Sequence, residues 1–228
     1  MDLSINEFCK NVKETLFIKH KDFPPDPKKY STTDNQTIIP IQREAYFLAL
    51  NKYLATGGTV LDVGFGLGYG LTILSIKARS VTGIDVDPRC VEYCRGALLG
   101  RNPKLVSLDH YDGQHIPFEN NHFDLVTCVG VLEHVEDYKK FLSELMRVSK
   151  NGVFISTPNR RPEHTNKDGT PKNYWHLREW SFDELSKILE TFGTLDWNFI
   201  NGDWEGPFEI SENSQKNTQA LSPFIKKN

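Results

Sequence analysis

The stretch TVLDVGFGLGYG, residues 59–70, is a short apolar run that reaches Asp62 and then places a glycine at every second position. In open α/β sheets, ligands bind beyond the carboxyl ends of the strands, where the strand order reverses. A glycine loop after the first strand lets the backbone approach a ligand closely and permits positive φ. The stretch therefore predicts a strand followed by a ligand-binding turn. Several cofactors use this geometry, so the ligand stays open at this point.

The spacing of the glycines narrows the choice of ligand. A dinucleotide fingerprint needs G-x-G-x-x-G, and here the third glycine position holds Tyr69. No G-x-x-x-x-G-K-[ST] sequence is present, which excludes a P-loop. What remains is Gly64-x-Gly66-x-Gly68 directly after a buried-strand pattern that contains Asp62. An enzyme that uses NAD is therefore disfavoured.

Strand and helix patterns alternate along the rest of the chain. The apolar run FDLVTCVG is continuous, as expected for a strand covered on both faces. Such alternation predicts a mainly parallel sheet with helices on both faces, joined by right-handed crossovers. We expect strands at 59–63, 80–85, 104–109, 123–130, 153–157 and 195–200, and helices at 41–55, 69–78, from Pro88, at 135–149 and at 181–192.

Composition and charge limit the class of protein. The 228 residues suit one ordinary domain with a sizeable core, and no apolar stretch approaches the length of a membrane span. A net charge of −3 argues against a large non-specific nucleic-acid surface. We expect a cytoplasmic protein, monomeric or homodimeric, with neither a membrane span nor a nucleic-acid partner. Its cysteines form no CxxC pair and are expected to be reduced: Cys9, Cys90, Cys94 and Cys128.

Four segments in register carry a family resemblance. VLDVGFGLG resembles motif I of the class I S-adenosylmethionine-dependent methyltransferases, and VTGIDVDP is similar to their second-strand segment. HYDGQHIPFENNHFDLV and VLEHVEDYKKFLSELMRVSKNGVFISTPN resemble two further segments of the family. The resemblance covers residues 57–158. One departure is Asn151-Gly152-Val153, where the family usually has Pro-Gly-Gly. The implied fold is a single-domain, Rossmann-like, doubly wound α/β fold with a mainly parallel seven-stranded sheet and helices on both faces.

The resemblance implies S-adenosylmethionine as cofactor and assigns roles to three carboxylates. Asp85 would bind the ribose hydroxyls, Asp112 the adenine amino group, and Asp62 with the loop carbonyls the ammonium group. This suits a cationic nucleoside without a pyrophosphate. Alternatives are a loop brace for Asp62, a helix cap for Asp85 (although Asp87 is better placed) and a turn aspartate for Asp112. The expected cofactor residues are Asp62, Gly64, Gly66, Gly68, Asp85, Val86, Asp112, Gly113 and Val129.

Candidate catalytic residues are few. Glu133 and His134 follow the fourth strand, and His176 lies in a later aromatic segment. Quinone-type O-methyltransferases, which this region resembles, carry E-x-x-E-H there and bind a divalent cation. Gly130 replaces the first glutamate of that motif, so we predict no metal. His134 is a candidate general base, and the alternative is a packing residue that caps its helix.

Two flanking segments supply candidate substrate contacts. Residues 158–180 are expected to form a lid over the cofactor, and HLREWSFDEL resembles methyltransferases of sugars and lipid- or saccharide-linked intermediates in bacterial surface-glycan pathways. The alternative is a cluster that only fixes the loop to the body. In the lead-in helix, Gln42 and Tyr46 are further candidates for closing the pocket. The expected substrate contacts are Tyr30, Arg43, Tyr174, Trp175 and Arg178.

The expected organisation is a lead-in with a covering helix at 1–56, a methyltransferase core at 57–212 with the lid inserted at about 158–180, and a loosely held polar tail at 213–228. The expected activity is methyl transfer to a hydroxyl oxygen of a small polar metabolite: a sugar, a nucleotide-sugar or a phosphorylated compound. The alternatives are a nucleic-acid or protein methyltransferase, and a non-catalytic cofactor-binding subunit of a partner.

Overall fold

The computed structural model describes residues 40–202, 207–214 and 217–227. These residues belong to one compact unit, Pro40–Asn228, and the preceding unit, Met1–Ile39, lies outside the described residues. The expected substrate contact Tyr30 and the thiol of Cys9 are therefore outside them as well.

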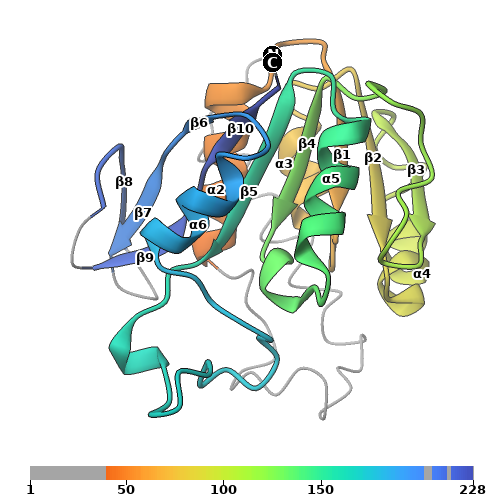
Figure 1. Cartoon of the computed structure of the whole chain (residues 1–228). Helices are drawn as coiled ribbons and strands as arrows, with labels where there is room; N and C mark the ends of the chain where they lie inside the picture. The colour runs from red at the N-terminus through yellow and green to blue at the C-terminus, as the bar shows by residue number, and fades with distance from the viewer. Residues whose placement is uncertain (1–39, 203–206, 215–216, 228) are drawn as a thin grey trace. The chain divides into compact units, whose positions relative to one another are not determined.

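Five parallel strands form the half of the sheet that carries the glycine loop (Figure 1). Their order is β3-β2-β1-β4-β5, so the strand order reverses between β1 and β4. Hydrophobic residues fill both faces of the central strands, and all five residues of β4 are buried. The predicted alternation and parallel pairing are confirmed. The strands are β1 (Thr59–Val63), β2 (Ser80–Asp85), β3 (Leu105–His110), β4 (Leu125–Val129) and β5 (Gly152–Pro158).

Helices cover both faces of this sheet. In Figure 1, α5 and α6 lie in front of the strands, and α2 and α3 lie behind them. The first helical segment begins as an α-helix and ends as a turn of π-helix, a feature that the sequence pattern did not predict. The helices are α2 (Pro40–Leu48), the π-turn η1 (Ala49–Tyr53), α3 (Tyr69–Leu74), α4 (Pro88–Ala97), α5 (Tyr138–Val148) and α6 (Phe182–Leu189), with 3-10 turns η2 (Leu132–His134) and η3 (Pro162–His164).

Side-chain caps fix where two of these helices start. The Asp87 side chain accepts a hydrogen bond from the backbone N–H of Arg89, with Pro88 at the first helical position of α4. At α6, Ser181 and Glu184 form a reciprocal capping box. Asp87 is therefore the N-cap of α4, as expected, and Asp85 is available for another role.

The carboxyl-terminal third departs from the prediction. The described residues form a ten-stranded, mixed sheet, so the expected seven-stranded sheet is wrong. The loosely held tail at 213–228 is also wrong, because residues 218–221 pair antiparallel with β5 and β7, and residues 224–226 with β5 and β6. The strands were not predicted because the segment is polar in composition and its apolar alternation is short. The added strands are β6 (Thr194–Asp196), β7 (Phe199–Gly202), β8 (Phe208–Ser211), β9 (Thr218–Leu221) and β10 (Phe224–Lys226).

A single hydrophobic cluster joins the parallel strands to these late strands. It includes Leu61, Val126, Phe141 and Ile155, and also Ile225 of β10. The side chains of Cys90, Cys94 and Cys128 are buried, and their reduced state stays a prediction. Among the residues described, no helix combines the length and apolarity that crossing a bilayer requires.

Ile225 provides a stability test of the β10 pairing. Its side chain is fully buried, so Ile225→Ala should leave a cavity and lower the free energy of unfolding by about 2–4 kcal/mol in urea denaturation. The matched control Ile210→Ala, in β8 where the side chain is 41% exposed, should cost less than about 1 kcal/mol. Equal losses from the two substitutions would contradict the burial of β10.

Candidate cofactor and acceptor site

The glycine loop after β1 takes backbone conformations that side chains disfavour. Gly64, Gly66 and Gly68 have φ of 75°, 54° and 81°. A Cβ at Gly64 would lie 2.4 Å from Cγ2 of Val131, so the loop packs directly against the segment that follows β4. A Cβ at Gly66 would meet no described atom within 4 Å. The middle of the loop therefore faces open space, where a ligand can approach the backbone.

Asp85 ends β2 beside this open space. Its Oδ2 accepts from the backbone N–H of Gly66 at 2.8 Å, and its Oδ1 accepts from that of Asp87 at 2.8 Å. The side chain is buried, and burial is the main cause of a raised pKa for this carboxyl. Each carboxylate oxygen has further acceptor capacity, so the group can also receive two hydroxyl donors. This geometry suits the ribose role predicted for Asp85.

An apolar wall adjoins Asp85. The Val86 side chain is 54% exposed, and a Cβ built on Gly113 would lie 3.1 Å from its Cγ1. Gly113 has φ of 80°, which keeps the turn after β3 close to Val86. An exposed valine against a glycine turn offers a flat apolar surface of the kind that an adenine ring contacts.

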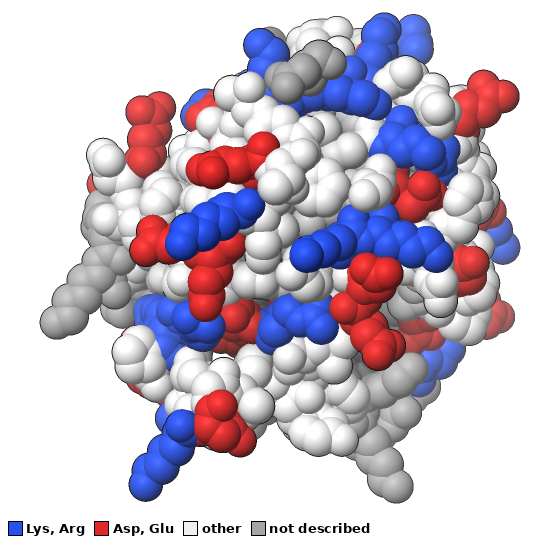
Figure 2. Space-filling model, in the orientation of Figure 1, with Lys and Arg blue, Asp and Glu red and all other residues white. Residues whose placement is uncertain are grey.

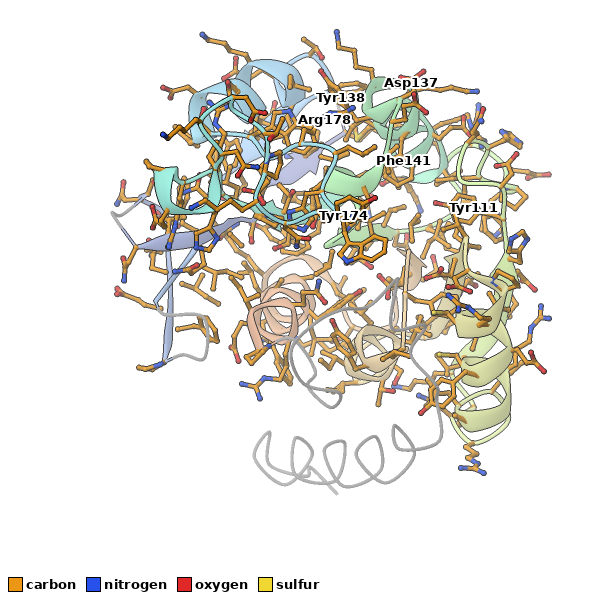
Figure 3. The ribbon with its side chains drawn as sticks, turned by 90° about the horizontal axis from the view of Figure 1, so that it is seen from below. Tyr111, Asp137, Tyr138, Phe141, Tyr174 and Arg178 are labelled. Atoms are coloured by element: carbon orange, nitrogen blue, oxygen red, sulfur yellow. The ribbon has the colours of Figure 1, made fainter. Side chains whose placement is uncertain are left out.

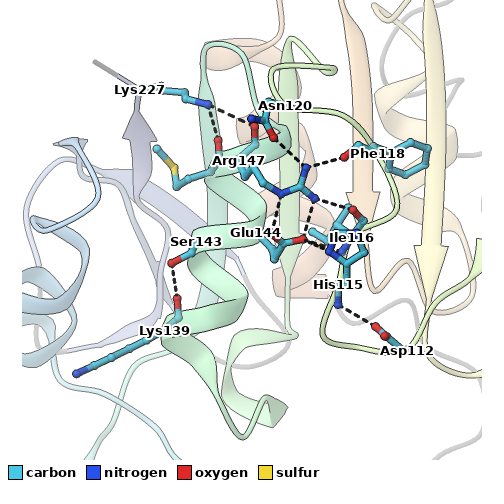
Figure 4. A network of polar contacts seen from close by, with 11 residues as sticks. Asp112, His115, Ile116, Phe118, Asn120, Lys139, Ser143, Glu144, Arg147 and Lys227 are labelled. Carbon is cyan, nitrogen blue, oxygen red and sulfur yellow. Dashed lines mark hydrogen bonds and ion pairs between the residues drawn. The ribbon is translucent and has the colours of Figure 1, made fainter.

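Asp112 holds the turn at the edge of this wall. Its Oδ1 accepts from the backbone N–H groups of Gln114 and His115, both at 2.8 Å, and these bonds lower the pKa of its carboxyl (Figure 4). Glu144 of α5 fixes the same turn by accepting from the backbone N–H of Ile116. Asp112 therefore has the turn-bracing role considered above, and its second oxygen can still meet an exocyclic amine. The adenine role stays a prediction.

Asp62 is enclosed rather than open to the site. Its side chain is fully buried and accepts from the Tyr46 hydroxyl at 3.1 and 3.2 Å and from Thr127 Oγ1 at 2.7 Å. Burial raises the pKa of Asp62 to about 7. The carboxyl thus joins α2, β1 and β4 beneath the glycine loop, which fits the loop-bracing alternative. Its contact with the cofactor ammonium group stays a prediction.

Helix α2 covers the loop from the amino-terminal side. A Cβ on Gly130 would lie 2.2 Å from Nε2 of Gln42, and the Gln42 side chain also accepts from the Tyr69 hydroxyl. Gly130, which stands where a quinone-type enzyme has a metal ligand, therefore makes room for Gln42. Val129, the neighbouring residue at the end of β4, is buried and pairs with Ser156, and its cofactor role stays a prediction.

The turn η2 places a carboxyl and an imidazole beside the glycine loop. Glu133 is buried and its Oε2 accepts from Thr157 Oγ1 at 3.0 Å. Burial is the main cause of a raised pKa for this carboxyl. His134 is exposed, and its Nε2 lies 3.9 Å from Glu133 Oε1. Val131, which packs on Gly64, accepts from the backbone N–H of His134, so η2 directly follows a residue that contacts the glycine loop.

The predicted lid segment, residues 158–180, meets η2 through hydrogen bonds and a ring contact. His134 Nδ1 lies 2.8 Å from the carbonyl oxygen of Trp175, and the Glu133 carbonyl accepts from the backbone N–H of Leu177 at 2.9 Å. The His134 and His176 rings meet edge to face with centroids 5.0 Å apart. His176 Nδ1 in turn lies 2.6 Å from Oε1 of the buried Glu179. The predicted catalytic residue His176 is therefore brought beside Glu133 and His134, which lie in an earlier segment of the sequence.

The predicted substrate contacts fall into two groups. Arg178 donates to the carbonyl oxygens of Val135 and Glu136 and lies over the Tyr138 ring, as Figure 3 shows for the two labelled side chains. Arg43 pairs with its neighbour Glu44. Tyr174, by contrast, is 88% exposed on the lid and packs edge to face on Trp175. Among the described residues, the Tyr174 side chain is therefore exposed and Trp175 is half-buried, whereas the two arginines have protein partners.

Four residues of this site were not predicted. Thr127 donates to the buried carboxyl of Asp62, and Thr157 donates to that of Glu133. In the sequence, each threonine is only a hydroxyl within an apolar run, which does not indicate a site. Glu179 orients His176 from three residues away in a non-helical turn, and Asn173 lies 3.0 Å from the other ring nitrogen. A glutamate near a lid histidine is the only one of these signals that sequence inspection can detect.

Comparison with known proteins gives this site its context. Residues 61–156 match the methyltransferase domain family Methyltransf_11. A probable S-adenosylmethionine-dependent methyltransferase of Mycolicibacterium smegmatis is 34% identical over 73% of this chain and 66% of that protein. A probable methyltransferase of the same kind from Mycobacterium tuberculosis is 30% identical over 75% and 63%. The chain thus spans slightly less than two thirds of the length of these curated relatives.

Solved structures share the fold. The YcgJ protein from Bacillus subtilis has a TM-score of 0.64 at 17% identity, covering 82% of this chain and 99% of that one. The PH0226 protein from Pyrococcus horikoshii has a TM-score of 0.65 at 17% identity, covering 91% and 99%. Residues 61–156 therefore match the methyltransferase domain family, and the solved structures share the fold of this chain. Family and fold together imply S-adenosylmethionine as the cofactor.

The buried Asp62 carboxyl predicts a specific pH dependence. Its pKa rises from 3.8 to about 7 on folding, so between these values the folded protein keeps a proton that the unfolded chain has lost. The free energy of unfolding should therefore fall as the pH rises through this window, by on the order of a few kcal/mol. Asp62→Asn should remove this decline in urea denaturation series. The exposed-site control Asp109→Asn should keep it, and an unchanged decline in Asp62→Asn would contradict the buried carboxyl.

Proposed function

We propose that this protein is an S-adenosylmethionine-dependent methyltransferase that acts on a hydroxyl oxygen of a small polar metabolite. The observation that carries the proposal is the acid–imidazole cluster at the mouth of the glycine loop: buried Glu133, exposed His134 and the lid residue His176. A hydroxyl acceptor must lose a proton during transfer, whereas an amine acceptor needs only its neutral form.

The predicted cofactor residues each contact a different part of the nucleoside. Asp85 accepts from the ribose hydroxyls, Val86 and Gly113 contact the adenine ring, and Asp112 accepts from its amino group. Gly66, whose Cα faces open space, lets the amino-acid tail lie against the backbone. Asp62 keeps the loop in shape through Tyr46 and Thr127. S-adenosylmethionine supplies an electrophilic methyl group when bound, and the chain contributes alignment and exclusion of water.

His134 is the group that accepts the hydroxyl proton. A carbonyl oxygen can only accept, so the 2.8 Å contact with Trp175 O requires the proton of the neutral imidazole on Nδ1. The lone pair is then on Nε2, ready to take a proton. The Glu133 carboxylate, 3.9 Å from Nε2, stabilises the imidazolium that results.

The surroundings favour an uncharged acceptor. Arg178 and Arg43, the cations expected to hold a phosphate, have protein partners, and the exposed Tyr174 beside the half-buried Trp175 remains. Figure 2 shows Lys and Arg side chains interspersed with Asp and Glu on one face. We therefore favour a sugar-like acceptor over a phosphorylated one, and a small molecule over a nucleic acid.

Cofactor binding tests the role of Asp85. Asp85→Asn removes the charge that accepts from the ribose hydroxyls, so S-adenosylhomocysteine should bind about 10–100-fold more weakly in isothermal titration calorimetry. The control is Asp109→Asn, one strand away in β3 and paired with Arg95 at the surface, which should bind as the parent does. The Asp85 role fails if both variants bind equally well.

Turnover tests the role of His134. With a hydroxyl acceptor selected from a sugar panel by S-adenosylhomocysteine release, His134→Gln should lower kcat by about 10²–10⁴-fold and leave S-adenosylhomocysteine affinity unchanged. His164→Gln, an exposed histidine of the same lid, should leave kcat as it was. An unchanged kcat in His134→Gln would exclude the histidine as the base.

A further inference from the structure

Three ligand atoms from two separate segments converge where the lid meets η2. A carboxylate oxygen of Glu133 and ring nitrogens of His134 and His176 all lie within 4.8 Å of one another. Glu133 is buried, His176 is half-buried and His134 is exposed, so the group opens toward solvent on one side. One carboxylate and two imidazoles with an open side are a donor set that divalent first-row metals bind in proteins.

The hydrogen bonds around both rings leave the lone pair on the same nitrogen, Nε2. His134 Nδ1 meets the Trp175 carbonyl and His176 Nδ1 meets the Glu179 carboxylate, so in the neutral rings both protons are on Nδ1. Asn173, whose Oδ1 accepts from the Trp175 N–H at 3.1 Å, directs its Nδ2 at His176 Nε2. Both Nε2 atoms therefore carry a lone pair, and that of His176 accepts from Asn173 in this structure. Metal-binding histidines have this arrangement, with the second nitrogen held by an oxygen acceptor.

Buried negative charge supplies a second, independent observation. Glu133 and Glu179 are both buried, and among the described residues their only ion-pair partners are His134 and His176. Oε2 of Glu179 is buried without a hydrogen-bond partner in the described part of the chain. The nearby Arg178 is engaged by two backbone carbonyls and the Tyr138 ring. Two buried carboxylates that form no ion pair with an arginine or lysine of the described residues favour an added cation.

We propose that Glu133, His134 and His176 bind a divalent cation of the zinc class, with Glu179 and the Trp175 carbonyl orienting the two rings. The sequence prediction of no metal considered only the ligands that follow Gly130. His176, from the later segment, supplies the third ligand. Metal bonds of 2.0–2.1 Å place ligand atoms about 3.4 Å apart in a tetrahedral site. The exposed His134 and the lid therefore close in by about one ångström, and Asn173 gives up its bond to His176.

A role of the cation in methyl transfer rests on the proposed function, whereas the binding of the cation does not. Its open position takes the acceptor hydroxyl, which loses its proton to water as a new O–CH₃ bond forms and the S–CH₃ bond of the cofactor breaks. His134 is then a ligand, and the base role described above belongs to the cation-free protein. The cation also links the lid to η2, so binding should stabilise the lid.

Zinc titration of the full, reduced chain after chelator treatment tests the site. One equivalent should bind in isothermal titration calorimetry, and the affinity should fall at least tenfold in Glu133→Gln and in His176→Gln, and by about tenfold in the orienting variant Glu179→Gln. The matched lid control His164→Gln should bind as the parent does. Co²⁺ should give the d–d absorption of a nitrogen and oxygen site, and zinc should slow proteolysis within residues 158–180.

Two outcomes would overturn the proposal. One is zinc binding that is equal in the parent, Glu133→Gln and His176→Gln. The other is a sulfur-to-cobalt charge-transfer band, which would place the ion at a cysteine. S-adenosylhomocysteine affinity measured on the same samples separates the two proposals, because failure of cofactor binding with intact zinc binding refutes the methyltransferase function alone. Retained cofactor binding with no zinc binding refutes the cation site alone.

Discussion

The Asp85 carboxylate at the end of β2 ties the strand to the glycine loop, and the site depends on this tie. The buried group accepts from the backbone N–H of Gly66 in the loop and from that of Asp87 before α4. The carboxylate thereby pairs with two backbone N–H groups near the point where the strand order reverses. The same carboxylate keeps acceptor capacity toward the open space beside Gly66. Structure and recognition thus depend on one side chain.

A second buried carboxyl supports the loop from below. Asp62 accepts hydrogen bonds from Tyr46 of α2 and Thr127 of β4, so α2, β1 and β4 are joined at the Asp62 carboxyl group. Its raised pKa follows from burial without a cationic partner among the described residues. A cationic cofactor above the loop would favour the ionised form. Cofactor binding and the protonation of Asp62 are therefore linked through the loop.

Sequence inspection predicted the parallel half of the fold because its signals are local. The apolar runs of β1, β2 and β4, the Asp87 cap and the glycine spacing each depend on neighbouring residues. The carboxyl-terminal strands were missed because β9 and β10 gain their stability from pairing with β5, which no local pattern shows. The sequence indicated Glu133 and His134 in one segment and His176 in another as separate catalytic candidates. Their convergence depends on where the lid folds back, and this depends on tertiary contacts such as Leu177 N–H to Glu133 O.

The central claim is that the carboxylate at the end of β2 binds the ribose of an adenosine cofactor beside the glycine loop. A crystal structure of the full chain with S-adenosylhomocysteine tests it most directly. We expect both ribose hydroxyls within hydrogen-bonding distance of Asp85 and the adenine ring against Val86 and Gly113. A nucleoside bound elsewhere, or an Asp85 side chain turned away from the ribose, would contradict it.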